Sequence, residues 1–238
     1  MTCENHDHSG HDSCILHVPL FTGLPEQGVL LLNEAVHSRR YRKGELVFQE
    51  GDRSDALYII NQGVVKIAQL ADTGKEHVLR FLFHGDFGGM SALFKEGLHY
   101  ANAEVIEDAV VCRIYRNDLK TILDHDSDMA YRFLAAISER LRDADEWAGS
   151  ISLMDAERRL AKTLLIFRAK AAAPGVYQLP VAKKDLAALI GITPETLSRK
   201  LAAFESQGVI SLTGKKGIEI VNVDVLEAIA GLLPQQRL

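Results

Sequence analysis

The sequence predicts an α+β fold in which a jelly-roll β-barrel is followed by a long helix and a C-terminal winged helix-turn-helix. Short apolar runs separated by glycine-containing turns fill residues 39–115, a pattern typical of a sandwich or barrel of jelly-roll type. Apolar residues then recur in alternating steps of three and four over 134–151. Two short helical patterns followed by a hairpin pattern occupy 186–221.

The chain of 238 residues is long enough for two modest domains, each with its own core. The changes of pattern place four parts in order. We expect an N-terminal segment over 1–17, the barrel over 18–124, the long helix over 125–152 and the winged helix-turn-helix over 153–238.

The composition is that of an ordinary soluble globular protein, with 47% hydrophobic and 25% charged residues. No apolar run is long enough to span a bilayer, and residues 1–19 lack the basic and apolar regions of a secretory signal. We therefore expect a cytoplasmic protein without a membrane partner. The sequence contains no G-x-S-x-G, P-loop or H-E-x-x-H motif, so an enzyme is not predicted.

Residues 1–17 are polar and rich in potential metal ligands. Cys3 and Cys14 flank three histidines, His6, His8 and His11. Three cysteines in a cytoplasmic chain rarely form a structural disulfide framework, so a metal, a cluster or a redox switch is favoured for any that are functional. The competing interpretation is a solvated tail.

The barrel region begins after a short helix predicted over about 25–36. The predicted strands are short runs of Val, Ile, Leu and aromatic residues, and they lie at 46–48, 56–60, 64–68, 77–83 and 109–115. The predicted turns contain Gly, Asn or Asp, and they lie at 51–52, 61–63, 71–74 and 84–86.

The long helix carries a narrow apolar seam with charged flanks. Its members repeat in steps of three and four: Leu134, Ile137, Leu141, Ala144, Ala148 and Ile151. Such a seam favours pairing with the same helix of a second copy, as in a coiled coil, and hence a homodimer. Packing of the helix on its own barrel is an equally good interpretation of this segment alone.

The C-terminal part begins with an amphipathic helix predicted over 155–172. Two shorter helical patterns follow and meet at a turn over 191–193, where Thr193 is a good N-cap and Pro194 suits the first helical position. On the second helix we expect Leu197, Leu201 and Phe204 to face the core. A hairpin over 209–221 with lysines at its tip completes the predicted winged helix.

The opposite face of this second helix presents Glu195, Ser198 and Arg199. Arginine can donate two hydrogen bonds to guanine, glutamate can accept from cytosine, and serine adapts to either base. The wider set of candidate DNA-contacting residues adds Thr193, Thr196, Lys200, Lys215 and Lys216. An ordinary amphipathic surface helix is the alternative for this segment taken alone.

Charge is distributed unevenly along the chain, whose net charge is −5. Between Asp155 and Asn222, eleven Lys and Arg residues stand against six Asp and Glu residues, a local charge of +5 that leaves −10 for the remainder. A basic region around a helix-turn-helix is the electrostatic pattern of a module that binds nucleic-acid phosphates.

The order of these parts, together with the run Glu195-Thr196-Leu197-Ser198-Arg199, resembles the FNR branch of the CRP/FNR family of bacterial transcription regulators. The resemblance covers essentially the whole chain. It implies a barrel of cyclic-nucleotide-binding type and a homodimer bound to double-stranded DNA, with RNA polymerase as a partner if the protein is an activator. The implied target is a palindrome of the form TTGAT, four bases, ATCAA.

Cyclic nucleotide receptors of this family bind ribose and phosphate through a Gly-Glu pair and an Arg-Ser pair. Here the matching positions carry Met90 in place of the Glu and Tyr100 in place of the Arg. Because a buried cyclic phosphate without that arginine would lack a counter-charge, we do not expect a cyclic nucleotide ligand. A different small effector could use the same pocket.

The resemblance also implies a sensor, because FNR holds an oxygen-labile iron–sulfur cluster on three N-terminal cysteines and one strand cysteine. Cys112 matches the strand cysteine, whereas only Cys3 and Cys14 stand near the N-terminus. One interpretation is a [4Fe-4S] cluster on the three cysteines and a histidine, chosen from His6, His8, His11 and His17.

Two further interpretations use the same residues. A disulfide between Cys112 and Cys3 or Cys14 would act as a thiol switch, and a zinc or iron ion would form a simple metal site. Cys112 could also be a small buried apolar residue without a sensing role.

The sequence therefore predicts a dimeric FNR-like regulator that responds to oxygen, redox state or nitric oxide. The alternative is a CRP/FNR-type regulator that responds to a small molecule or metal ion, with incidental cysteines. A metal-buffering or cupin-like enzyme with an added DNA-binding domain is the rival from another class.

Overall fold

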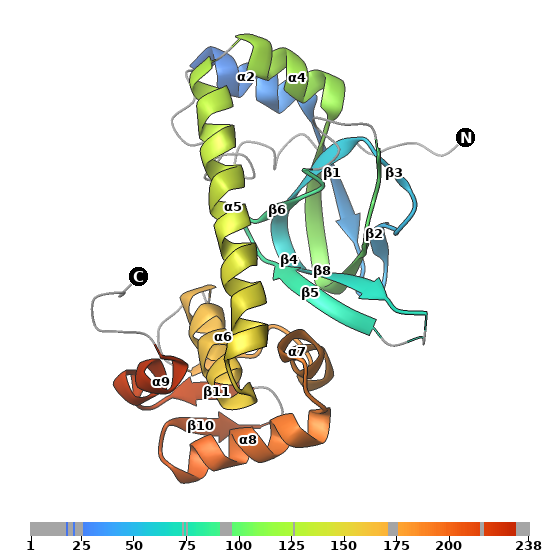
Figure 1. Ribbon diagram of the computed structural model, residues 1–238. Coiled ribbons are helices and arrows are strands. Elements are labelled where there is room, and N and C mark those ends of the chain that lie inside the picture. The colour runs from blue at the N-terminus through green and yellow to red at the C-terminus, as the bar shows by residue number, and fades with distance from the viewer. Residues whose placement is uncertain are drawn as a thin grey trace. The chain divides into compact units, whose positions relative to one another are not determined.

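The computed structural model describes Val18, Phe21 and residues 26–72, 74, 76–90, 97–125, 127–170, 176–214 and 217–231 (Figure 1). The chain divides into two compact units, Met1–Leu141 and Arg142–Leu238. The first unit is rich in strands and the second in helices, so the predicted α+β class is confirmed. Within the described ranges, no helix combines the length and the apolar character that a membrane span requires.

The first unit is built on an antiparallel sheet whose main path is β1-β8-β4-β5. β2 also pairs with β8, β6 also pairs with β4, and two short strands, β3 and β7, pair separately. The bounds are Val36–Tyr41 (β1), Leu46–Phe48 (β2), Arg53–Ser54 (β3), Ala56–Leu70 (β4), Glu76–Leu82 (β5), Phe87–Gly88 (β6), Gly97–Leu98 (β7) and Asn102–Tyr115 (β8).

The structure corrects the predicted turn at 61–63. Residues 56–70 form one long strand, β4, whose register against β8 shifts between Ile60 and Val64. Gly63 has φ +83°, and a Cβ there would collide with the backbone of Asp108. The Asn-Gln-Gly signal therefore marks a β-bulge in a continuous strand rather than a reversal of the chain.

Besides the short strands β3, β6 and β7, two longer strand segments of the first unit were not predicted. β1 has four consecutive exposed residues between its buried ends, so it lacks the alternation that marks a half-buried strand. The first half of β8, residues 102–108, was also missed, because its polar residues interrupt the apolar run.

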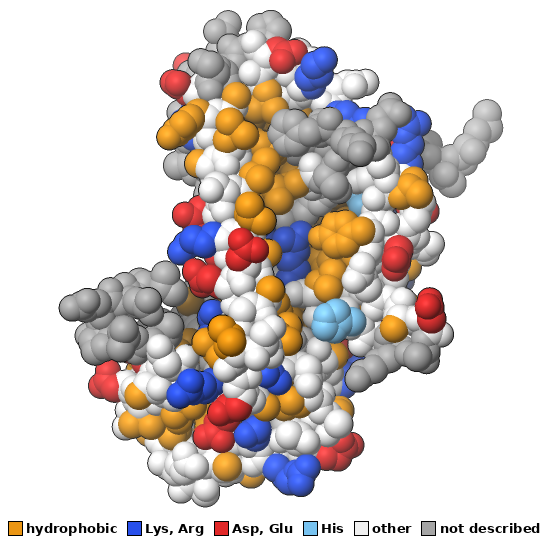
Figure 2. All heavy atoms as spheres, viewed as in Figure 1, with side chains coloured by type: hydrophobic (Ala, Val, Ile, Leu, Met, Phe, Trp, Pro, Cys, Tyr) orange, Lys and Arg blue, Asp and Glu red, His pale blue; other side chains and the backbone are white. Residues whose placement is uncertain are grey.

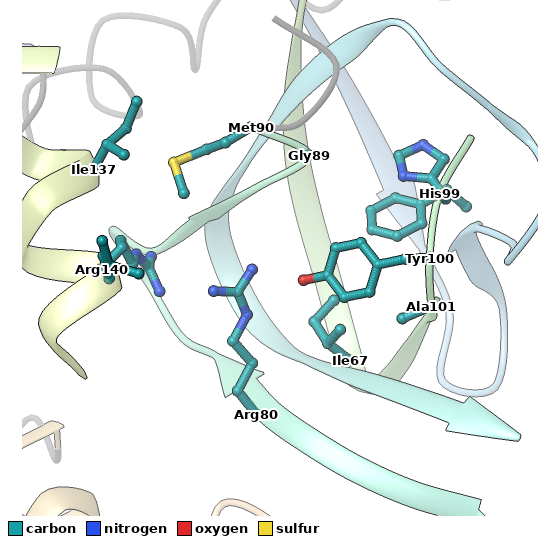
Figure 3. Close-up of a pocket in the computed structure, with 11 residues that line it drawn as sticks. Ile67, Arg80, Gly89, Met90, His99, Tyr100, Ala101, Ile137 and Arg140 are labelled. Carbon is teal, nitrogen blue, oxygen red and sulfur yellow. The ribbon is translucent and has the colours of Figure 1, made fainter. Parts of the chain in front are cut away.

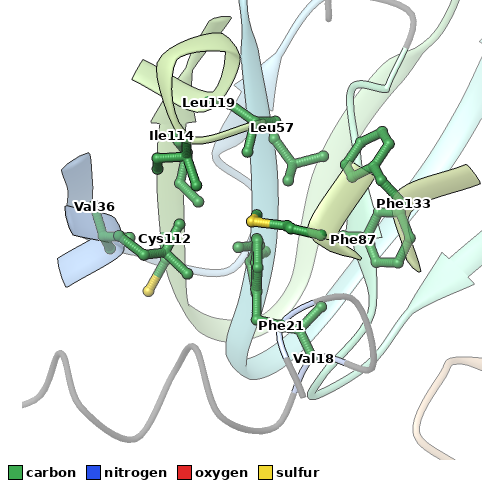
Figure 4. Packing of buried hydrophobic residues seen from close by; sticks show 13 residues of the cluster. Val18, Phe21, Val36, Leu57, Phe87, Cys112, Ile114, Leu119 and Phe133 are labelled. Carbon is green, nitrogen blue, oxygen red and sulfur yellow. The ribbon is translucent and has the colours of Figure 1, made fainter. Parts of the chain in front are cut away.

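Three helices accompany the sheet: α2 (Glu26–Ala35), α4 (Arg116–His125) and α5 (Ser127–Leu153). One core cluster joins them to the strands, and its fully buried members include Phe21, Leu57, Ile114 and Phe133 (Figure 4). A second cluster, which includes Tyr58, Ile67 and Val105, lies among the strands themselves. The start of α5 therefore belongs to the core of the first unit.

The second unit contains α6 (Ala156–Lys170), α7 (Lys183–Ile190), α8 (Pro194–Ser206) and α9 (Val223–Ala230). Its sheet has the order β10-β11-β9, with bounds Ile210–Thr213 (β10), Gly217–Ile220 (β11) and Val176–Gln178 (β9). This is the predicted winged helix-turn-helix, with β9 and α9 as additions. α9 begins at an Asn222 cap and buries Leu226 and Ala230.

Candidate DNA-binding and sensor sites

The helix α8 has the local structure that its sequence predicts. Gly191 ends α7 in the left-handed conformation at φ +72°, and the Thr193 hydroxyl accepts a 3.2 Å hydrogen bond from the backbone N–H of Thr196. Pro194 occupies the first turn of the helix. These caps fix the angle at which α8 leaves the turn.

The two faces of α8 divide as predicted. Leu197, Leu201 and Phe204 are buried, whereas Glu195, Ser198 and Arg199 are exposed. The amphipathic pattern is thereby confirmed. A polar surface of three different hydrogen-bonding groups is left open at the N-terminal end of the helix.

The exposed side chains have a defined local arrangement. The Ser198 hydroxyl donates to the Pro194 carbonyl at 2.9 Å, and the Arg199 guanidinium lies 3.3 Å from the Thr196 hydroxyl. The pKa of Glu195 is held below its ordinary value, first by the backbone N–H of Glu195 itself and then by the Thr193 hydroxyl. Glu195 is therefore ionised at neutral pH and acts only as an acceptor, beside an arginine that acts only as a donor.

The remaining candidate DNA-contacting residues separate into two groups. Lys200 lies away from the exposed set, because its ammonium group pairs with the Glu157 carboxylate of α6 at 3.3 Å. The wing lysines Lys215 and Lys216 lie outside the described residues.

Arg159 is a supporting residue that the sequence reading missed. Its guanidinium donates to the Ile190 carbonyl at the end of α7, at 2.8 Å, and to the carbonyl of Met154. It thus joins the start of α6 to the helix that precedes α8. No sequence pattern identified this role, because the partners are backbone carbonyls 31 and 5 residues away.

The seam predicted on α5 is mostly exposed in the single chain. Leu134 and Leu141 are each 62% exposed and Ile151 is 40% exposed, while Ala144 and Ala148 are also exposed. Ile137 differs, because it is half-buried and packs against the core cluster of the first unit. Figure 2 shows apolar side chains along the first half of this helix.

Both interpretations of α5 therefore have structural support on different faces. Met129 and Phe133 are fully buried against the first unit, whereas the neighbouring Tyr131 is 75% exposed. One face of the helix packs on its own barrel, and the other leaves apolar residues without cover in the single chain.

Cys112 lies near the C-terminal end of β8, opposite Ser38 of β1 and Ile59 of β4. Its side chain is 1% exposed, its Sγ lies 4.0 Å from the Ser38 hydroxyl, and it belongs to the cluster that contains Val36 (Figure 4).

The sulfur of Cys112 is disulfide-bonded. The chain has only two other cysteines, Cys3 and Cys14, and both lie outside the described residues, as do His6, His8, His11 and His17.

The sulfur of Cys112 does not have the form that a metal or a cluster requires. A thiolate is required for either, and a sulfur already bonded to another sulfur cannot supply one. Among the described residues, no group of three or more His, Cys, Asp or Glu side chains could hold a metal ion. The disulfide-bonded arrangement therefore does not fit a [4Fe-4S] cluster, zinc or iron at Cys112.

A pocket of about 280 Å³ opens in the first unit, between the strands and the first half of α5. Met90 and Tyr100 both line it (Figure 3). They stand at the positions where cyclic nucleotide receptors of this kind carry Glu and Arg. Two arginines that the sequence reading missed, Arg80 of β5 and Arg140 of α5, also line the pocket. The pocket therefore contains guanidinium groups from two segments that are distant in the sequence, although the position of the family's arginine carries Tyr100.

Comparison with known proteins agrees with this geometry. The cyclic nucleotide-binding domain model matches residues 38–126, and the Crp-like helix-turn-helix domain model matches 158–229. A cyclic AMP receptor protein of Thermus thermophilus is 32% identical over 212 residues, which cover 89% of this chain and 96% of that protein. This chain belongs to the CRP/FNR family of transcription regulators.

Two other members of the CRP/FNR family show its breadth. The fumarate and nitrate reduction regulatory protein of Salmonella typhi is 28% identical over 194 residues, covering 80% of this chain and 77% of its own. The structure of FixK2 from Bradyrhizobium japonicum has a TM-score of 0.76 at 27% identity, covering 82% of this chain and 96% of that chain.

CRP/FNR membership identifies the second unit as the part that binds DNA. Regulators of this family bind DNA through the helix-turn-helix and typically act as dimers, and they are not enzymes. The family contains members that bind cyclic nucleotides or other effectors, so membership alone does not identify the signal.

Proposed function

We propose that this protein is an FNR-like regulator that binds an FNR-box-like palindrome as a homodimer and responds to thiol oxidation at Cys112. The observation that carries the proposal is the disulfide at Cys112 within the core cluster of the first unit. The fumarate and nitrate reduction regulatory protein of Salmonella typhi matches 80% of this chain, which supports assignment to the FNR branch. The site of action is DNA, so the proposed location is the cytoplasm.

The chemistry is a thiol–disulfide switch between Cys112 and one N-terminal cysteine, Cys3 or Cys14. Two thiols lose two protons and two electrons as the S–S bond forms. Hydrogen peroxide can accept both, so that its O–O bond breaks and two water molecules leave. A dithiol reductant reverses the step by thiolate attack on the disulfide.

The response reaches α5 through packing. Cys112 shares its cluster with Met129 and Phe133, which lie on the first turns of that helix. Formation of the disulfide changes what packs beside these residues, and a closely packed core responds by shifting between discrete arrangements. The proposed outcome is a population shift in the pairing of two α5 helices, which sets whether two recognition helices lie one DNA turn apart.

The DNA contacts are assigned by chemistry. Arg199 reads guanine through two donors, Glu195 accepts from cytosine N4, and Ser198 and Thr196 adapt to either. Lys215 and Lys216 of the wing, with Thr193 at the helix N-terminus, contact phosphates. Lys200 instead holds α8 to α6 through Glu157.

The dimer is assigned to the exposed apolar face of α5. The proposed contacts are Leu134, Leu141, Ala144, Ala148 and Ile151, with Ile137 at the border between the dimer and the barrel. The small residues Ala144 and Ala148 keep the pairing weak enough for a bias of a few kcal/mol to change it. RNA polymerase is the further partner if the protein activates transcription.

The test compares DNA binding by reduced protein, prepared without oxygen, with binding after treatment with hydrogen peroxide. The palindromic duplex is the ligand, and the two affinities should differ by about tenfold or more, which corresponds to a coupling free energy of about 1.4 kcal/mol. Cys112→Ser should abolish the difference while leaving binding intact.

Cys3→Ser and Cys14→Ser serve as matched variants, because only the true disulfide partner should reproduce the Cys112→Ser result. Equal affinities of reduced and oxidised wild-type protein would exclude the redox response. Iron and acid-labile sulfide in anaerobically purified protein would indicate that an iron–sulfur cluster, and not a thiol switch, is the sensor.

A second candidate function rests on the pocket. Its two arginines and open volume favour a regulator that responds to a small molecule, with or without the thiol switch.

A further inference from the structure

Within the part of the chain that the structure describes, Arg80 of the first-unit pocket has no carboxylate paired with it. Arg80 is half-buried, and its Nε atom is buried without a hydrogen-bond partner in the structure. The guanidinium points from β5 into the pocket, between Arg140 and the Tyr100 side chain in the view of Figure 3. A guanidinium removed from water is stabilised when an anion accepts its hydrogen bonds.

The second arginine of the pocket is already compensated. Arg140 lies 3.9 Å from the Asp86 carboxylate, donates to the Phe87 carbonyl at 3.1 Å and stacks over the Phe87 ring at 4.6 Å. Arg140 thus connects α5 to the turn before β6. The positive charge that remains for a ligand is chiefly that of Arg80.

The other residues that line the pocket determine which kind of uncharged group the ligand can carry. The described residues around the cavity are mainly apolar: Phe48, Ile67, Gly89, Met90, Ala101, Ile137 and Leu141. No carboxylate stands among these lining residues, so the hydroxyls of a sugar would find few acceptors in the described lining. Burial of such hydroxyls without partners is unfavourable, whereas an apolar body fits.

One wall of the pocket is flat and aromatic. Phe48 and His99 stack with ring centroids 3.8 Å apart and planes 10° from parallel. Burial lowers the pKa of His99, so its ring is neutral at neutral pH, and its Nε2 is a second buried polar atom without a hydrogen-bond partner in the structure. A flat wall of this kind suits a planar ligand.

We infer that this pocket binds a small organic carboxylate with an apolar, planar body, and that Arg80 is its main anchor. A carboxylate matches the planar guanidinium with two parallel hydrogen bonds. A bound carboxylate also competes with Asp86 and Phe87 for Arg140, so occupancy bears on α5. This inference is independent of the redox proposal, since it uses neither Cys112 nor the DNA-binding unit.

The test is a ¹⁹F NMR titration of 4-fluorobenzoate with the full-length protein at constant ionic strength. The neutral amide 4-fluorobenzamide is the control ligand, because it has the same ring without the charge. Wild-type protein should bind the carboxylate saturably and the amide at least about tenfold more weakly, since one charge-assisted pair is lost. Arg80→Gln should weaken carboxylate binding by about tenfold or more, and Arg80→Lys by less.

Arg40→Gln is the matched variant, because Arg40 is an exposed arginine of strand β1 in the same sheet that does not line the pocket. It should bind 4-fluorobenzoate as wild type does, and circular dichroism melts should show that both glutamine variants are folded. The inference is overturned if binding is not saturable, if the amide binds as well as the carboxylate, or if folded Arg80→Gln binds like wild type. Tighter binding of cyclic AMP that persists in Arg80→Gln would also overturn it.

Discussion

Glu195, Ser198 and Arg199 owe their exposure to the apolar residues that alternate with them along α8. Because Leu197 and Leu201 are fully buried, the helix cannot rotate without exposing them. The polar face is therefore fixed in orientation relative to the rest of the second unit. Arg159 contributes at this scale too, since its guanidinium donates to the Ile190 carbonyl at the end of the preceding helix.

Arg199→Ala should reduce discrimination for the palindromic site by about 1–3 kcal/mol, because a donor pair to guanine is lost. Competitive gel-shift titrations against duplexes altered at that guanine measure the effect. Arg158→Ala is the control, since Arg158 is an exposed arginine on α6 of the same unit. Equal losses in the two variants would show that Arg199 contributes charge but no base reading.

In two elements, β4 and α5, contacts with other segments decide which structure a local sequence pattern forms. β4 continues through Gly63, which the sequence places in a predicted turn, because the pairing with β8 accommodates a bulge there. α5 carries two apolar faces, one of which the first unit buries through Met129 and Phe133. Its second face, which includes Leu134 and Leu141, remains exposed in the single chain.

Gly63→Ala should destabilise the first unit by about 2 kcal/mol or more, because the added methyl group meets backbone atoms as well as an unfavourable φ. Gly51→Ala is the control that separates the backbone contact from the unfavourable φ. Gly51 has φ +87°, and a Cβ added there would have no atom within 4 Å, so its cost is that of the left-handed conformation, about 1–2 kcal/mol. Urea unfolding of both variants checks the difference, and equal midpoints would contradict the bulge argument.

The whole molecule is organised by α5, which begins in the core of the first unit and ends in the second. Cys112 and the pocket touch the same helix at separate points, Cys112 through the cluster that contains Phe133 and the pocket through Arg140. The protein thus has two candidate inputs and one element that could transmit both. Under the proposed function, the readout is the pairing of this helix between two copies.

Leu134→Asp should weaken dimerisation by about tenfold or more, because a charge would enter an apolar interface. Leu134 is 62% exposed in the single chain, so the fold of each copy should survive the change. Ala135→Asp places the same charge on the adjacent exposed position and should leave the dimer intact. Sedimentation velocity over a range of concentrations measures the dimerisation of both variants. A Leu134→Asp variant that remains dimeric would show that the dimer interface lies elsewhere.

The sequence by itself determined the features that depend on local periodicity and capping. The stripe Leu197-Leu201-Phe204, the Thr193 cap and the hairpin wing follow from spacing and residue type, because neighbouring residues alone decide them. The run from Glu195 to Arg199, together with the order of barrel, long helix and winged helix, indicated the family. Only the tertiary structure decided three other features: the bulge at Gly63, the surroundings of Cys112 and the presence of Arg80 and Arg140 in one pocket. Each of these joins residues far apart in the chain, and such contacts leave no periodic trace in a single sequence.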